Sequence, residues 1–130
     1  MGSNQELLSR RKVAVPRGVA NATPVFAAHA ANAEIWDVQG RRYVDFAGGI
    51  AVLNVGHRHP RVIAAVQKQL ELFSHTAFQV MAYEGYIALA ERLNAIAPFS
   101  GPAQTVLFTT GAEATKNAVR VARAATGRQG

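Results

Sequence analysis

The segment from Thr105 to Gly127 constrains the fold most, because it has the pattern of a strand, a turn and a helix in direct succession. Residues 105–109 form a continuous apolar run with β-branched members, typical of a strand that is covered on both faces in a parallel sheet. Thr110-Gly111 then turns the chain into a helix that we expect to end at Gly127. This succession predicts an α/β architecture.

A β-hairpin is predicted between residues 34 and 46. Two short runs rich in aromatic and β-branched residues flank Gln39-Gly40, and this pair supplies a residue that tolerates positive φ. Asp37 is expected to stabilise the turn by bonding back to its own backbone. Beyond the hairpin, Gly48-Gly49 permits a close backbone approach or an unusual bend.

Three further helices are predicted from apolar spacing and from their start and stop residues. A proline is suited to the first position of the second helix, and Pro98 is expected to end the third. These helices are expected at residues 4–12, 60–73 and 83–97.

Composition excludes several classes of protein. At 130 residues and 49% hydrophobic content, the chain has the size and make-up of one ordinary globular domain. The absence of cysteine excludes disulfides, thiolate metal sites and a cysteine nucleophile. The polar first fifteen residues do not have the form of a secretory signal, and no later segment is long enough to span a membrane. We therefore expect a soluble, cytoplasmic protein that does not contact a membrane.

The formal net charge of +6 raises the question of nucleic-acid binding. Such binding requires basic residues gathered on one face, with aromatic residues to stack on bases. The basic residues here are instead scattered along the chain, a distribution usually explained by solvated charge. We therefore expect no nucleic-acid partner.

The turn before the last predicted helix is a candidate binding site. Backbone N–H groups near Gly111 would be unpaired at the positive end of the helix, an arrangement that favours a phosphate. A corner of this kind taken alone is more often a purely structural turn. Glu113 is either a catalytic carboxylate or, as is more common in a first turn, a complement to the helix dipole.

Two polar stretches are weaker candidates. His57 and His59 alternate like a metal-binding pair but lack a third type of ligand, so a polar turn before a helix is the preferred interpretation and no metal is expected. In residues 74–79, ligand contacts and buried hydrogen bonds explain His75 and Gln79 equally well. No serine hydrolase triad can be assembled around Ser74.

Three motifs in this order resemble the N-terminal third of the class III aminotransferases, which depend on pyridoxal 5'-phosphate (PLP). They are WDVQGRRYVDFAGGIAV at residues 36–52, GHRHP at 56–60, and TTGAEA at 109–114 with Asn117-Ala118. Within the family, residues 17–19, 74–79 and 122–128 are most similar to enzymes that act on 4-aminobutyrate and 5-aminovalerate. Acetylornithine and ornithine aminotransferases share the hairpin and glycine motifs but are less similar in residues 74–79.

The resemblance implies the α/β fold of aminotransferase fold type I. Residues 1–58, with the helix and β-hairpin, would belong to the small domain. Residues 59–130 would be the incomplete start of the large, parallel-sheet domain that binds PLP. The implied reaction transfers the amino group of 4-aminobutyrate to 2-oxoglutarate, giving succinate semialdehyde and glutamate, with 5-aminovalerate or acetylornithine and ornithine as alternative substrates. A homodimer or tetramer is implied for the full-length enzyme.

The resemblance also assigns site residues. Gly111 and Ala112 would hold the cofactor phosphate through their backbone N–H groups, and Ile50 and Gln79 would line the substrate pocket. The family commonly has serine where this chain has Ala112. The missing hydroxyl removes a hydrogen bond worth on the order of 1 kcal/mol.

No catalytic residue is assigned within these 130 residues. The three lysines, Lys12, Lys68 and Lys116, do not resemble the cofactor-binding lysine of the family. We therefore expect the chain alone to be inactive. A noncatalytic dimerisation module is the alternative from a different class.

Overall fold

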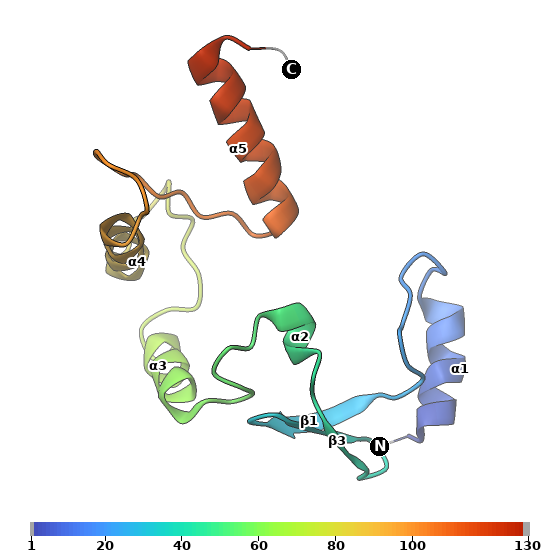
Figure 1. The fold of residues 1–130 in the computed structure, drawn as a ribbon. Helices are drawn as coiled ribbons and strands as arrows, with labels where there is room; N and C mark the ends of the chain where they lie inside the picture. Colours follow the sequence, from blue (N-terminus) through green and yellow to red (C-terminus); the bar gives the residue numbers. More distant parts are fainter. Residues whose placement is uncertain (1, 129–130) are drawn as a thin grey trace. The chain divides into compact units, whose positions relative to one another are not determined.

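A computed structural model describes residues 2–128 of the chain (Figure 1). The chain divides between Ser74 and His75 into two compact units. The first unit contains α1 (Asn4–Ala14), β1 (Ala27–Ala31), β2 (Glu34–Asp37), β3 (Arg42–Val44), α2 (Gly48–Ala51) and α3 (Pro60–Leu70). The second contains α4 (Glu84–Ala95) and α5 (Gly111–Thr126).

The first unit is built around an antiparallel sheet of order β1-β2-β3. The predicted hairpin is confirmed as β2 and β3, with Glu34 paired to Val44, and Gly40 in its turn has a φ of 80°. Strand β1 was not predicted, because its alanine-rich sequence lacks the β-branched residues that mark strands. It pairs with β2, and the ring of His29 stacks on Trp36 with 4.7 Å between ring centroids.

Asp37 at the end of β2 is the one buried residue in the described part of the chain, with 1% of its surface exposed. Its Oδ1 accepts hydrogen bonds from the backbone N–H groups of Gln39 and Arg41, both at 2.9 Å, which confirms the predicted turn bond. Its Oδ2 accepts from the Asn4 side chain at 2.9 Å and from the Tyr43 hydroxyl at 3.1 Å. Desolvation raises the pKa of Asp37, but these four hydrogen bonds together outweigh it and hold the pKa below its ordinary value.

Helix α1 is attached to the hairpin through one polar side chain. Asn4 in the first turn donates to Asp37 and, at 2.9 Å, to Oε1 of Gln39, while its own Oδ1 accepts from the N–H of Phe26 at 2.8 Å. The helix begins with Ser3 as N-cap, whose hydroxyl accepts from the N–H of Glu6. This helix confirms the prediction and is two residues longer at its C-terminus than expected.

The other predicted helices are also confirmed, with shorter ends. Helix α3 begins at Pro60 as expected but ends at Leu70, and α4 ends at Ala95, before Pro98. Helix α5 ends at Thr126, and its C-cap Gly127, the stop expected from the sequence, has a φ of 68°, the left-handed conformation that favours glycine at this position.

The strand predicted at residues 105–109 is absent from the structure, and this expectation was wrong. A strand is defined by its hydrogen-bonded neighbour, and no second strand runs beside this segment within residues 2–128. Two of its residues bond to helix α4 instead: the Leu107 N–H donates to the Tyr86 hydroxyl at 2.9 Å, and the Thr105 hydroxyl donates to Asn94 at 2.7 Å.

Apolar side chains do not form a buried core in the described residues. Large apolar residues are exposed on the helices, in the loops and on the segment that follows α4. Exposed apolar area of this extent is unusual on the surface of a soluble monomer. Separately, no helix in residues 2–128 has the length and apolarity needed to cross a bilayer.

We expect Asn4→Ala to loosen α1 from the hairpin, since it removes three side-chain hydrogen bonds at once. Hydrogen exchange at the Phe26 N–H, measured at single-residue resolution in the full-length protein, should accelerate about tenfold, the equivalent of one to two hydrogen bonds. Gln5→Ala, on the same helix turn with an exposed side chain, is the matched control. Equal exchange in the two variants would contradict the assigned role of Asn4.

Candidate functional site

The turn into α5 is closed by a reciprocal pair of hydrogen bonds. The hydroxyl of Thr110, the N-cap, accepts from the N–H of Glu113 at 3.1 Å, and the Glu113 carboxylate accepts from the N–H of Thr110 at 3.1 Å. The Thr109 hydroxyl donates to the same carboxylate at 2.5 Å. This capping box uses the side chain of Glu113 to order the turn, which favours the structural interpretation of this residue over a catalytic one.

Two N–H groups at this corner are left available. The N–H of Glu113 is taken by Thr110, and that of Ala114 donates to the Thr110 carbonyl at 3.1 Å. No hydrogen bond is recorded within residues 2–128 from the N–H groups of Gly111 and Ala112. A Cβ built on Gly111 would meet no atom within 4 Å, so a ligand can reach this backbone. Two free donors at the positive end of a helix fit a phosphate.

The Glu113 carboxylate is stabilised in its charged form. The hydrogen bond from the Thr109 hydroxyl is the largest cause that lowers the pKa of Glu113, and the Thr110 backbone and hydroxyl add to it against desolvation. The pKa therefore lies below its ordinary value. At neutral pH the carboxylate is ionised, and a negative charge beside the first turn complements the helix dipole.

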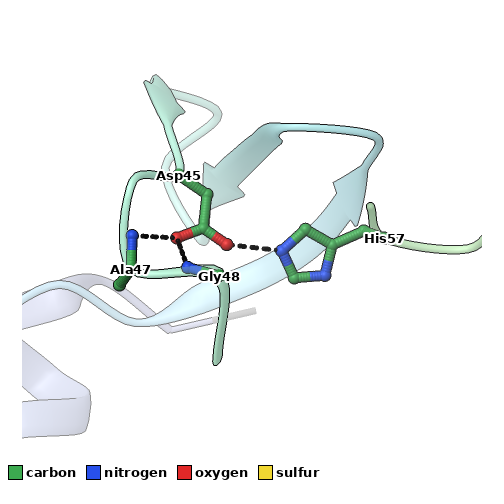
Figure 2. Close-up of polar contacts among 4 residues, drawn as sticks. All are labelled: Asp45, Ala47, Gly48 and His57. Atoms are coloured by element: carbon green, nitrogen blue, oxygen red, sulfur yellow. Dashed lines mark hydrogen bonds and ion pairs between the residues drawn. The ribbon is translucent and has the colours of Figure 1, made fainter. Parts of the chain in front are cut away.

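A second polar cluster closes the loop that follows β3 (Figure 2). Asp45 Oδ1 accepts from the N–H groups of Ala47 at 3.0 Å and Gly48 at 2.9 Å, and Asp45 Oδ2 lies 2.7 Å from Nε2 of His57. The Asp45 side chain is 6% exposed and that of His57 22%. The His57 hydrogen bond is the largest cause that holds the pKa of Asp45 below its ordinary value. Because an ionised carboxylate only accepts, His57 donates through Nε2.

Sequence reasoning missed this pair, since it considered His57 only as a metal ligand beside His59 or as part of a polar turn before a helix. The available signal was Asp45 itself, because an aspartate placed before a glycine-containing turn commonly accepts from backbone N–H groups two or three residues later. No cluster of three or more His, Asp or Glu suited to a metal ion is found in residues 2–128.

The loop held by Asp45 contains a left-handed turn, α2. Its φ angles are 49° at Gly48, 63° at Gly49, 64° at Ile50 and 63° at Ala51, and the Ala51 N–H donates to the Ala47 carbonyl at 2.8 Å. This confirms the unusual bend predicted at Gly48-Gly49. Glycine adopts this conformation readily, whereas a residue with a side chain is destabilised in it by about 1–2 kcal/mol. A β-branched residue such as Ile50 is therefore a strained choice here, and strain of this kind is concentrated at functional sites.

The predicted site residues lie in both units. Ile50 is in the first unit, on α2, with 92% of its surface exposed. Gln79, Gly111 and Ala112 are in the second unit, and the Gln79 side chain is exposed on the segment between α3 and α4. Near Gln79, the ring of Phe78 stacks on Tyr86 at 4.2 Å, and the Thr76 hydroxyl donates to the Met81 carbonyl.

Residues 14–130 match the aminotransferase class-III family, and the chain belongs to this family of PLP-dependent transaminases. Over 98% of its length, it is 60% identical to the 5-aminovalerate aminotransferase DavT of Pseudomonas aeruginosa. Over its whole length, it is 57% identical to the 4-aminobutyrate aminotransferase GabT of Escherichia coli. The chain spans 30% of the length of each of these relatives.

Structural comparison agrees with this assignment. The chain is similar to an omega-transaminase from Sphaerobacter thermophilus, with a TM-score of 0.85 and 32% identity over 98% of this chain and 29% of that one. The fold is therefore that of the PLP-dependent aminotransferases, as the sequence predicted.

We expect the pKa of Glu113 to rise toward its ordinary value in Thr109→Val, which removes the hydroxyl donor. In the wild type, the stabilisation from this carboxylate is complete above its unfolded pKa of about 4.3 and is lost as pH falls through the lower folded pKa. The titration midpoint can be followed by carboxyl ¹³C chemical shifts in glutamate-labelled full-length protein, with Glu113→Gln for assignment.

Thr115→Val is the matched control, because the Thr115 hydroxyl donates to the Gly111 carbonyl on the same helix turn and does not contact Glu113. An equal shift of the Glu113 midpoint in both valine variants would contradict the assigned cause.

Proposed function

We propose that this chain is part of a PLP-dependent aminotransferase that moves the amino group of 4-aminobutyrate to 2-oxoglutarate, giving succinate semialdehyde and glutamate. The observation that carries the proposal is the pair of free N–H groups at Gly111 and Ala112, positioned by a capping box in a chain of the class-III aminotransferase family. The similarity to GabT supports the choice of 4-aminobutyrate.

In this proposal, Gly111 and Ala112 hold the phosphate of PLP. The capping box occupies the neighbouring donors and acceptors, so that only these two N–H groups remain to bind the anion. When bound, PLP supplies the electron sink that makes amino transfer possible. Ala112 offers no hydroxyl to the phosphate, so the backbone N–H is its whole contribution.

Ile50 and Gln79 would line the substrate pocket. Ile50 is almost fully exposed on a turn that is held in a strained conformation, so its apolar side chain is free to contact a ligand. The exposed amide of Gln79 can donate to a carboxylate such as those of 4-aminobutyrate and 2-oxoglutarate. An apolar wall with a few polar groups is the usual composition of a small-molecule site.

The proton transfers of the reaction are not assigned to any residue of this chain. The three lysines are exposed and lie on three different helices: Lys12 on α1, Lys68 on α3 and Lys116 on α5. Only Lys116 shares a helix with Gly111. We propose that the cofactor-binding lysine belongs to a part of the enzyme beyond these residues, that the enzyme is a homodimer or tetramer, and that the chain alone is inactive.

5-Aminovalerate is the second candidate substrate, favoured by the 60% identity to DavT. It is one methylene longer than 4-aminobutyrate and carries the same terminal groups. A difference of one methylene in an apolar pocket gives discrimination of about 10- to 200-fold. The ratio of kcat/KM for the two amines therefore reports on the pocket wall to which we assign Ile50.

Purified full-length protein with PLP should form glutamate from 2-oxoglutarate and 4-aminobutyrate. We expect kcat/KM for 4-aminobutyrate to exceed that for 5-aminovalerate by about tenfold or more, with N-acetylornithine and ornithine as further comparisons. A reversed order would favour the second candidate. Failure to form glutamate with any of these amines would overturn the proposal and favour a noncatalytic dimerisation module.

Ala112→Ser should tighten PLP binding about fivefold, because the added hydroxyl can donate one hydrogen bond to the phosphate. The dissociation constant can be measured by titrating the apoenzyme with PLP and following absorbance. Binding of pyridoxal, which lacks the phosphate, should not change.

Ala114→Ser is the matched control for this substitution, since the Ala114 N–H already donates to the Thr110 carbonyl. Tighter PLP binding in Ala114→Ser equal to that in Ala112→Ser, or none in either, would contradict the placement of the phosphate at Ala112.

A further inference from the structure

The loop from Asp45 to His57 is anchored to the sheet at its far end. The N–H of Asn32 donates to the His57 carbonyl at 3.0 Å, and the His57 N–H donates to the Asn32 carbonyl at 2.8 Å. Asn32 lies between β1 and β2. Gly56 has a φ of 76°, and a Cβ on it would lie 3.0 Å from backbone atoms of Asn32, so the close approach requires glycine. The backbone of His57 is thus fixed to the hairpin.

The side chain of His57 connects this fixed backbone to Asp45 at the start of the loop. Its Nε2 lies 2.7 Å from Asp45 Oδ2, and both side chains are largely shielded from solvent. The other oxygen of Asp45 accepts from the N–H groups of Ala47 and Gly48, the residue before the left-handed turn and the first residue of it. Figure 2 shows the Asp45 carboxylate between His57 on one side and these two N–H groups on the other.

Besides Asp45, the side chains of Val52 and Leu53, which directly follow the turn, lie close to it at Gly49. Ile50 is 92% exposed, so its own burial does not stabilise the left-handed conformation. A strained conformation persists only where surrounding contacts determine it. The contacts available here are the hydrogen bonds within the turn, the two that Asp45 accepts at its start, and the Val52 and Leu53 side chains beside Gly49.

We propose that Asp45 and His57 are positioning residues for substrate selection, because together they hold the turn that presents Ile50 to the substrate. This inference rests on the proposed function, which makes Ile50 a wall of the substrate pocket. Neither residue touches the substrate. They keep the Ile50 side chain at a fixed position in the pocket wall. A fixed wall allows the pocket to discriminate between amines of different chain length.

The role of the His57 imidazole can be tested by a matched pair of substitutions at this position. Glutamine places a donor nitrogen at about the distance from the backbone of His57 Nε2, whereas the side chain of asparagine is too short to reach Asp45. Both retain the backbone bonds to Asn32. We expect His57→Asn to reduce the preference between 4-aminobutyrate and 5-aminovalerate about tenfold, and His57→Gln to keep the ratio of the two kcat/KM values within about twofold.

Two controls separate positioning from general destabilisation. Asp37→Asn disturbs a different carboxylate cluster in the same unit and should lower thermal stability without changing the ratio. In an Ile50→Ala background, His57→Asn should change the ratio no further, because the effect is exerted through Ile50. Asp45→Ala should reproduce His57→Asn in both backgrounds, and amide exchange at Gly48 should accelerate in each variant that loses the pair.

The outcomes distinguish this inference from the function on which it rests. Wild-type enzyme that turns over neither amine would overturn the proposed function, and the positioning role with it. Active wild-type enzyme whose ratio is unchanged by His57→Asn and by Asp45→Ala would overturn the positioning role alone. An undiminished effect of His57→Asn in the Ile50→Ala background would also overturn it, since the pair would then act by another route.

Discussion

The buried carboxylate of Asp37 is the interaction on which the first unit depends. A carboxylate is strongly disfavoured away from water unless its oxygens accept hydrogen bonds, and here four donors come from α1, the β2–β3 turn and β3. These elements converge on one residue because each supplies a donor to it. In the absence of a buried apolar core among the described residues, this polar hub connects the helix to the sheet.

The same use of a carboxylate recurs in the two parts of the chain that we propose to bind cofactor and substrate. Asp45 orders the N–H groups at the start of α2, and Glu113 orders the turn into α5. In all three cases hydrogen bonds outweigh desolvation and lower the pKa, so that the side chains are charged at neutral pH. Turns that would otherwise be free to move are therefore held by local polar contacts before any ligand binds.

The large apolar side chains, in contrast to the buried carboxylate of Asp37, are exposed. The helices present apolar side chains that no described residue buries, and the apolar segment at residues 105–109 has no strand beside it. The chain spans 30% of the length of its relatives GabT and DavT. A parallel strand needs a hydrogen-bonded neighbour before it can form a ladder.

Features whose causes are local could be predicted from the sequence. The hairpin turn at Gly40, the bond of Asp37 to its own turn, Pro60 at a helix start and Gly127 at a helix end all depend on residues close in the chain, and all are confirmed. The family also followed from motifs in a fixed order. The rest depends on tertiary structure. Strand β1 forms because β2 lies beside it, whereas residues 105–109 form no strand because no strand in residues 2–128 runs beside them. Asp45 contacts His57, twelve positions further along the chain, only because the loop between them folds back. Hydrogen-bonded pairing between distant segments has no period or local signature that a single sequence displays.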